Sequence, residues 1–132
     1  MPITAIYAGL LTPLLILLSI RVIQQRRGAK VGVGDGGDAI LLRRMRVQAN
    51  FAEYVPFALL LLGLAESVYT WAWYLHLMGL ALLLGRLSHA YGVSQSTEIF
   101  SFRVSGMATT FAVIGATAAA CIFGSLRLAL GY

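Results

Sequence analysis

Residues 3–23 read ITAIYAGLLTPLLILLSIRVI, an almost uninterrupted apolar run in which the one charged residue, Arg21, lies near the end. About 20 apolar residues in a helix cross the hydrocarbon core of a bilayer, and an arginine near the end can extend its side chain into the headgroups. A secretory signal peptide has a basic region before its apolar run and a small-residue cleavage site after it, and neither pattern is found here. We therefore predict a retained membrane-spanning helix.

Three further apolar stretches follow along the chain, and the predicted spans cover residues 3–23, 43–65, 71–88 and 103–126. Of the 132 residues, 59% are hydrophobic and only 11% are charged, and the mean hydropathy is +0.82. Soluble domains have about 45–50% apolar and about 25% charged residues. The sequence thus predicts an all-α integral membrane four-helix bundle that forms a single domain, and it excludes a soluble domain and a nucleic-acid-binding protein.

The basic residues are concentrated at one end of the predicted bundle. Nine of the ten Lys and Arg residues lie around the connections between the first two and the last two predicted spans, and only Arg127 lies elsewhere. Connections rich in Lys and Arg stay in the cytoplasm, so we expect both termini and the short turn at 65–70 to face outside. The single cysteine, Cys121, excludes an internal disulfide and a metal site built from several thiolates.

The first connection is rich in glycine and is predicted to be a flexible polar loop. It contains Gly28, Gly32, Gly34, Asp35, Gly36, Gly37 and Asp38. The spacing fits neither the phosphate-binding pattern G-x-x-x-x-G-K-[ST] nor a clean G-x-G-x-x-G after a strand, which disfavours a nucleotide site. Calcium binding by Asp35 and Asp38 is disfavoured as well, since no further acidic residue follows at ligand spacing.

The fourth predicted span carries small residues at every fourth position, namely Ala112, Ala116, Ala120 and Gly124. A ridge of small side chains lets another helix approach closely. We therefore expect this helix to pack tightly within the bundle.

Polar side chains interrupt the start of the second predicted span. Arg43, Arg46, Asn50 and Glu53 are separated by three, four and three residues, which places them within about 80° on one helix face. Charged groups within a membrane are costly and usually functional, although a polar seam that locks helices together is the structural alternative. Two arginines, an amide and a carboxylate on one face suit a small zwitterionic ligand that has carboxylates and an amine.

Residues 46–56, RVQANFAEYVP, closely resemble the second-helix signature of the MAPEG superfamily, the membrane-associated proteins of eicosanoid and glutathione metabolism. The pattern R-x-Q-x-N-x-x-E-Y-x-P is especially similar to that of leukotriene-C synthase and the microsomal glutathione transferases. Residues 31–37 resemble the loop of bacterial members. Four spans in a chain of 132 residues extend the resemblance over the whole sequence.

The resemblance implies a homotrimer in a bacterial inner membrane, with glutathione as co-substrate and no metal, bound between neighbouring chains near the cytoplasmic side. By their positions in the motif, Arg46, Asn50, Glu53 and Tyr54 would hold the charged ends and the backbone of the tripeptide. Gln48 matches the motif too, but it projects about 200° from Arg46 around the helix. We therefore expect Gln48 to serve the site of the adjacent subunit.

Two further arginines match the family. Arg86 corresponds to an arginine that contacts the ligand, and Arg103 corresponds to the arginine credited with stabilising the glutathione thiolate. Eicosanoid-making members have tyrosines three and seven residues after the first of these arginines, where this chain has His89 and Val93. A general detoxifying role is therefore expected in place of eicosanoid synthesis. His89 either donates a hydrogen bond to a glutathione carboxylate or lies at the hydrated interface.

The resemblance thus implies a glutathione transferase or peroxidase, surrounded by membrane lipids, that conjugates glutathione to lipophilic electrophiles or reduces lipid hydroperoxides. A small four-span multidrug transporter is one alternative, but such a protein isolates its membrane glutamate among apolar residues. Glu53 instead shares its helix face with Arg43, Arg46 and Asn50. A non-catalytic family member that binds lipid or partner proteins is the other alternative, and the presence of Arg103 favours the enzyme.

Overall fold

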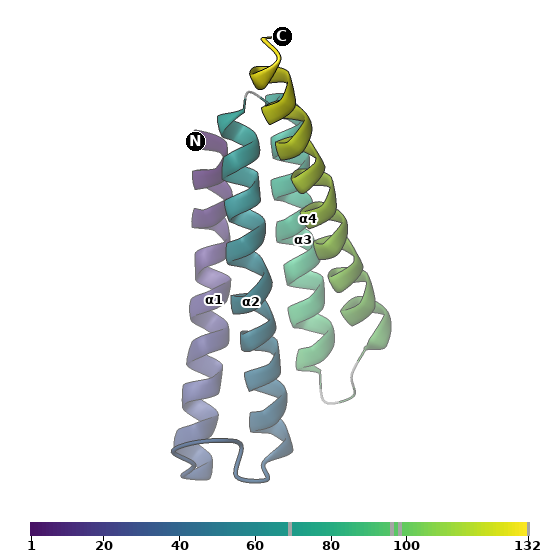
Figure 1. Ribbon diagram of the computed structural model, residues 1–132. Helices are drawn as coiled ribbons and strands as arrows, with labels where there is room; N and C mark the ends of the chain where they lie inside the picture. Colours follow the sequence, from purple (N-terminus) through teal and green to yellow (C-terminus); the bar gives the residue numbers. More distant parts are fainter. Residues whose placement is uncertain (69, 96, 98, 132) are drawn as a thin grey trace.

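The computed structural model describes residues 1–68, 70–95, 97 and 99–131. These residues form four α-helices, which are α1 (Pro2–Ala29), α2 (Ala39–Ser67), α3 (Ala72–Ser94) and α4 (Phe100–Ala129). The helices lie side by side with alternating direction, so the start of α1 and the end of α4 lie at one end of the bundle and the α1–α2 loop lies at the other (Figure 1). The predicted all-α four-helix bundle is confirmed.

The helices extend past their predicted spans, because the backbone stays helical after the apolar run has ended. α1 continues to Ala29, so Gly28 lies within the helix, and the prediction that it belongs to the loop was wrong. The helix ends where Lys30 adopts a left-handed conformation with φ 55°, and the Val31 N–H donates to the carbonyl oxygen of Arg26 at 3.0 Å. Hydrogen bonds of this kind satisfy the last carbonyl groups of a helix.

Asp38 caps the start of α2 and joins it to the end of α1. Its Oδ1 accepts hydrogen bonds from the backbone N–H groups of Ile40 at 2.8 Å and Leu41 at 3.1 Å, and its Oδ2 accepts one from Gln25 Nε2 at 2.7 Å. An N-cap carboxylate satisfies backbone donors that have no partner within the helix. The bond from Gln25, followed by that from the Leu41 backbone, holds the pKa of the Asp38 carboxyl below its ordinary value.

We expect the bundle to lose stability as the pH falls through the lowered pKa of Asp38. A carboxyl whose pKa is lower in the folded than in the unfolded protein contributes fully above its unfolded pKa of about 3.9, and that contribution is lost in more acidic solution. Asp38→Asn keeps an N-cap acceptor but cannot titrate. Thermal unfolding followed by circular dichroism should therefore depend less on pH in the variant, between about pH 5 and pH 2. An equal pH dependence of the two proteins would contradict this assignment.

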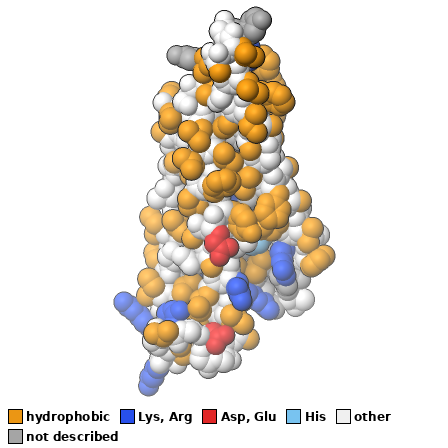
Figure 2. Space-filling model, in the orientation of Figure 1, with side chains coloured by type: hydrophobic (Ala, Val, Ile, Leu, Met, Phe, Trp, Pro, Cys, Tyr) orange, Lys and Arg blue, Asp and Glu red, His pale blue; other side chains and the backbone are white. Residues whose placement is uncertain are grey.

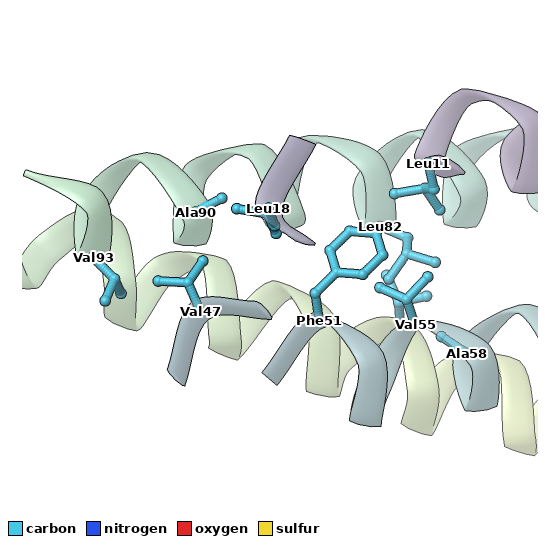
Figure 3. Close-up of a cluster of buried hydrophobic side chains, with 10 residues drawn as sticks. Leu11, Leu18, Val47, Phe51, Val55, Ala58, Leu82, Ala90 and Val93 are labelled. Carbon is cyan, nitrogen blue, oxygen red and sulfur yellow. The ribbon is translucent and has the colours of Figure 1, made fainter. Parts of the chain in front are cut away.

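The interior of the bundle is a column of aliphatic side chains around Phe51 (Figure 3). Its buried members are Leu11, Leu18, Val47, Phe51, Val55, Ala58, Leu82, Ala90, Val93 and Val113. The outer faces of the helices are apolar as well, and Leu17, Leu60 and Phe123 are 53%, 57% and 67% exposed. Exposed apolar side chains on so many sides are unfavourable in water and suit contact with lipid.

Among the described residues, α1, α2 and α4 are long and apolar enough to cross a membrane. α3 is not among these three helices, and it carries His76, Arg86 and His89. Arg86 and His89 are buried, however, and α3 exposes a leucine stripe that lipid can cover. The stripe consists of Leu77, Leu80, Leu84 and Leu87. This arrangement supports the predicted four-span bundle.

α3 and α4 pack closely where glycines face the neighbouring backbone. A Cβ atom built on Gly106 would lie 2.6 Å from both the carbonyl oxygen of Gly85 and the backbone nitrogen of His89, which is too close for a side chain. The buried face of α4 consists of Gly106, Thr110, Val113 and Thr117. The predicted ridge of small residues does not form this contact, and its first member, Ala112, is exposed. Its last member, Gly124, packs closely against Val68 at the end of α2, where an added Cβ atom would lie too close to Val68 Cγ2.

Candidate functional site

A hollow of about 590 Å³ opens beside the first half of α2. Lys and Arg side chains gather toward the end of the bundle with the α1–α2 loop, whereas hydrophobic side chains dominate the rest of the face shown in Figure 2. The polar residues that line the hollow come from α2, α3 and α4 and are Arg43, Arg46, Asn50, Glu53, His89 and Arg103. The polar face predicted on α2 therefore meets residues of two other helices at one site.

Arg46 and Glu53 present the opposite charges of the hollow, two helical turns apart on α2. Both side chains are exposed, and neither forms a hydrogen bond or an ion pair with the part of the chain that the structure describes. A guanidinium has five N–H donors and a carboxylate has two acceptor oxygens. The two groups can therefore bind the oppositely charged ends of one ligand.

Arg86 lies behind the wall of the hollow, with a side chain that is 0% exposed. Its Nη2 donates to Asn50 Oδ1 at 2.6 Å and to His89 Nδ1 at 3.2 Å, and both acceptors belong to lining residues. Its Nη1 donates to Thr110 Oγ1 on α4 at 3.3 Å. Arg86 thus links α2, α3 and α4 and sets the orientation of two side chains that face the hollow.

The positive charge of Arg86 is not paired with a carboxylate among the described residues. Its Nε has no hydrogen-bond acceptor there, and the ring centroid of Phe51 lies 5.8 Å from the guanidinium carbon. An uncompensated cation in a buried position is costly. Its charge therefore favours an anionic ligand in the adjoining hollow.

His89 is 4% exposed and forms part of the wall of the hollow. Arginine can only donate hydrogen bonds, so the contact with Arg86 makes His89 Nδ1 the acceptor and assigns the proton of the neutral ring to Nε2. Within the described ranges, no group of three or more His, Cys, Asp or Glu side chains could hold a metal ion.

Arg103 lies in the first turn of α4 and lines the hollow with an exposed side chain. Its backbone lies close to α3, because a Cβ atom on Gly92 would be 2.8 Å from the backbone nitrogen of Arg103. The N-terminus of a helix carries partial positive charge. The guanidinium and the helix start therefore both stabilise negative charge at this side of the hollow.

The model of the MAPEG family matches residues 4–123 of the chain. The chain belongs to the MAPEG family. It is 36% identical over 112 residues to the inner membrane protein YecN of Escherichia coli K12, and equally to that of Escherichia coli O6:H1 (strain CFT073), with 85% of this chain and 84% of each relative covered. Together with its apolar helices, this relationship assigns the chain to the inner membrane as an integral, multi-pass protein.

In this MAPEG protein, two of the second-helix residues predicted to contact glutathione lie outside the hollow. Tyr54 is half-buried, and its ring packs edge-on against Phe111 of α4 with 5.3 Å between the ring centroids. Gln48 is half-buried too and does not line the hollow, as expected from its direction on the helix. Contact of Gln48 and Tyr54 with glutathione stays a prediction.

The MAPEG site also includes residues that the sequence analysis did not assign to it. Arg43 lines the hollow, as expected for a member of the polar face of α2, although the family motif gave it no role. Thr110 Oγ1 accepts from Arg86 and donates to the carbonyl oxygen of Gly106 at 2.8 Å. The signal for Thr110 was weak, because a threonine four residues after a glycine in an apolar helix is typical of ordinary helix packing.

Proposed function

We propose that this MAPEG protein is a glutathione-dependent membrane enzyme that conjugates glutathione to lipophilic electrophiles or reduces lipid hydroperoxides. The observation that carries the proposal is the charge pattern of the hollow. Its described lining contains three arginines and one carboxylate, Glu53, and the buried Arg86 lies behind it. The three arginines are Arg43, Arg46 and Arg103. Glutathione has two carboxylates, one ammonium group and one thiol, so its charges complement this pattern. The volume of about 590 Å³ also lies within the range of small-molecule sites.

The residues of α2 would hold the ends of the tripeptide. Glu53 binds the ammonium group of the γ-glutamyl end, and Arg46 binds a carboxylate. Asn50 hydrogen-bonds the peptide backbone through its amide nitrogen, because its Oδ1 already accepts from Arg86. In this assignment Arg86 is a positioning residue, since its contacts reach the hollow through Asn50 and His89.

Arg103 would stabilise the glutathione thiolate. A free thiol has a pKa of about 8.5, so only a few per cent is ionised near pH 7, and lowering that pKa by about two units requires roughly 2.7 kcal/mol. One hydrogen bond from a charged donor contributes about 1.5–3 kcal/mol. The thiolate then forms a bond to an electrophilic carbon, which expels a leaving group. With a hydroperoxide, two glutathione molecules give glutathione disulfide, an alcohol and water.

The proposed functional form is a homotrimer in which neighbouring chains complete the site. The open side of the hollow in one chain supports this assembly, as does the position of Gln48 outside it. Lipophilic substrates would enter from the bilayer, which surrounds the exposed apolar faces of the helices. The mass of the protein in mild detergent tests the assembly, and a monomer would contradict it.

Glu53→Gln is expected to raise the dissociation constant for glutathione by about tenfold or more, since one charge-assisted bond worth about 1.5–3 kcal/mol is removed. Isothermal titration of the purified protein with glutathione measures this change. Asp35→Asn is the matched control, because it removes the same charge from the loop away from the hollow. Unchanged affinity in Glu53→Gln, or a wild-type protein that binds no glutathione, would refute the proposal. Loss of proton-dependent uptake with no glutathione binding would identify a transporter instead.

A further inference from the structure

A second basic pocket, of about 380 Å³, lies between α1, α2 and the end of α3. It differs from the candidate site, which is formed by α2, α3 and α4. Arg21, Arg43 and Arg44 line the second pocket, and its described lining contains no acidic residue. Arg43 lines both pockets, whereas Arg21 and Arg44 line only the second.

The guanidinium groups of Arg21 and Arg44 are held in place by contacts between helices. Arg21 Nη1 donates to Ser94 Oγ on α3 at 2.9 Å, and Arg44 Nη1 donates to the backbone carbonyl oxygen of Arg21 at 3.0 Å. Both arginine side chains are half-buried. Each contact uses one of the five N–H donors of a guanidinium, so both side chains keep donors for a ligand.

No carboxylate neutralises these two arginines within ion-pair distance in the part of the chain that the structure describes. Asp38, near Arg44, already accepts hydrogen bonds on both carboxylate oxygens. Two like charges held together repel each other. An anion that accepts hydrogen bonds from both guanidinium groups would relieve this repulsion, and the tetrahedral oxygens of a phosphate group suit two arginines.

The position of the pocket indicates where such an anion comes from. Arg21 lies near the end of the apolar run of α1, and the same pocket is lined by Leu18, Ile40 and Val47. Ile20, beside Arg21, is 44% exposed on the outer face of the helix. A lipid needs positive charge for its anionic headgroup and an adjoining apolar surface for its acyl chains, and both lie side by side here.

We propose that this pocket binds the phosphate group of an anionic phospholipid. Arg21 and Arg44 donate to the phosphate oxygens, and the lipid chains lie along Leu18 and the outer face of α1. The site occupies the predicted cytoplasmic leaflet, where anionic lipids attract basic residues. This binding is independent of the glutathione proposal.

Native mass spectrometry of the full-length protein in mild detergent, titrated with phosphatidylglycerol or phosphatidylcholine, tests the site. The wild type should bind phosphatidylglycerol more tightly, and Arg21→Gln or Arg44→Gln should each weaken that binding by about fivefold without changing the binding of phosphatidylcholine. Arg27→Gln is the matched control, because it removes the same charge from an exposed position of α1 outside the pocket. Its affinity for phosphatidylglycerol should stay within about twofold.

Gln95→Glu provides a second variant that leaves every arginine in place. The new carboxylate would lie in the lining of the pocket, compete with the phosphate and lower the affinity for phosphatidylglycerol. Circular dichroism should show the same helix content as the wild type. Three results would overturn the proposal. Arg27→Gln could lose as much affinity for phosphatidylglycerol as the pocket variants, or the wild type could bind the two lipids equally. Millimolar inorganic phosphate could also displace phosphatidylglycerol. A change of oligomeric mass in Arg21→Gln with unchanged lipid affinity would also overturn it, since the pocket would then be a contact between copies.

Discussion

Arg103→Leu is expected to lower the rate of glutathione conjugation by about 100-fold, the usual cost of removing one donor that stabilises a reacting anion. The dissociation constant for glutathione should stay within a few fold, because Arg46 and Glu53 would still bind the charged ends. The loss of rate is expected because Arg103 lies in the first turn of α4 and lines the hollow. Its guanidinium stays positively charged at any working pH and can donate a hydrogen bond to a sulfur anion. The N-terminus of α4 adds partial positive charge at the same place.

The ultraviolet absorbance of bound thiolate measures this effect directly, together with conjugation of a chromogenic electrophile. The thiolate signal at neutral pH should disappear in Arg103→Leu and persist in Arg127→Leu, which removes the same charge near the other end of α4. A full thiolate signal in Arg103→Leu would show that another group stabilises the thiolate. Parallel loss of binding and rate would indicate that Arg103 only anchors the helix.

Gly106→Ala is expected to destabilise the protein by about 1–3 kcal/mol, the usual cost of adding a methyl group to a tightly packed interior. The new Cβ would lie 2.6 Å from the backbone of α3 at Gly85 and His89. Backbone atoms cannot turn aside as a flexible side chain does, so α3 and α4 must separate. Since His89 and Thr110 both contact Arg86, the separation should weaken glutathione binding too.

Gly115→Ala is the matched control on the same helix, because no atom lies within 4 Å of a Cβ at that position. Alanine is favoured over glycine within a helix by up to about 1 kcal/mol, so this variant should be slightly more stable. Reversible unfolding in a series of detergent mixtures with increasing sodium dodecyl sulfate, followed by circular dichroism, compares the two. Similar midpoints for the two variants would show that the close contact of α3 and α4 is not maintained in solution.

Much of the architecture follows from local features of the sequence. The apolar runs predicted four helices, and the spacing of Arg43, Arg46, Asn50 and Glu53 placed them on one face, as the structure confirms. The ends of the helices were predicted less well, since hydropathy marks the part of a helix that lies in lipid and not the whole helix. The extension of α1 through Gly28 is the clearest case.

Local features could not predict which parts of distant helices meet. The small residues of α4 predicted close packing along a ridge from Ala112 to Gly124. Gly124 does lie against Val68 at the end of α2, whereas α3 approaches α4 at Gly106, outside the ridge. The pattern of small residues on one helix carries no information on the face of its partner. Arg86 was predicted as a ligand contact by position in the family, whereas the structure places it behind Asn50 and His89.

Sequence patterns alone predicted the membrane class, the four helices, the polar face of α2 and the family. Hydropathy, helical period and the motif at 46–56 are properties of neighbouring residues, and they do not depend on how the helices pack. The packing of the helices showed that Arg86 is buried without a carboxylate partner among the described residues. It also showed that His89 Nδ1 is an acceptor and that the α2 face meets Arg103 in one hollow. These features depend on burial and on partners from three helices, which arise only when α2, α3 and α4 pack together.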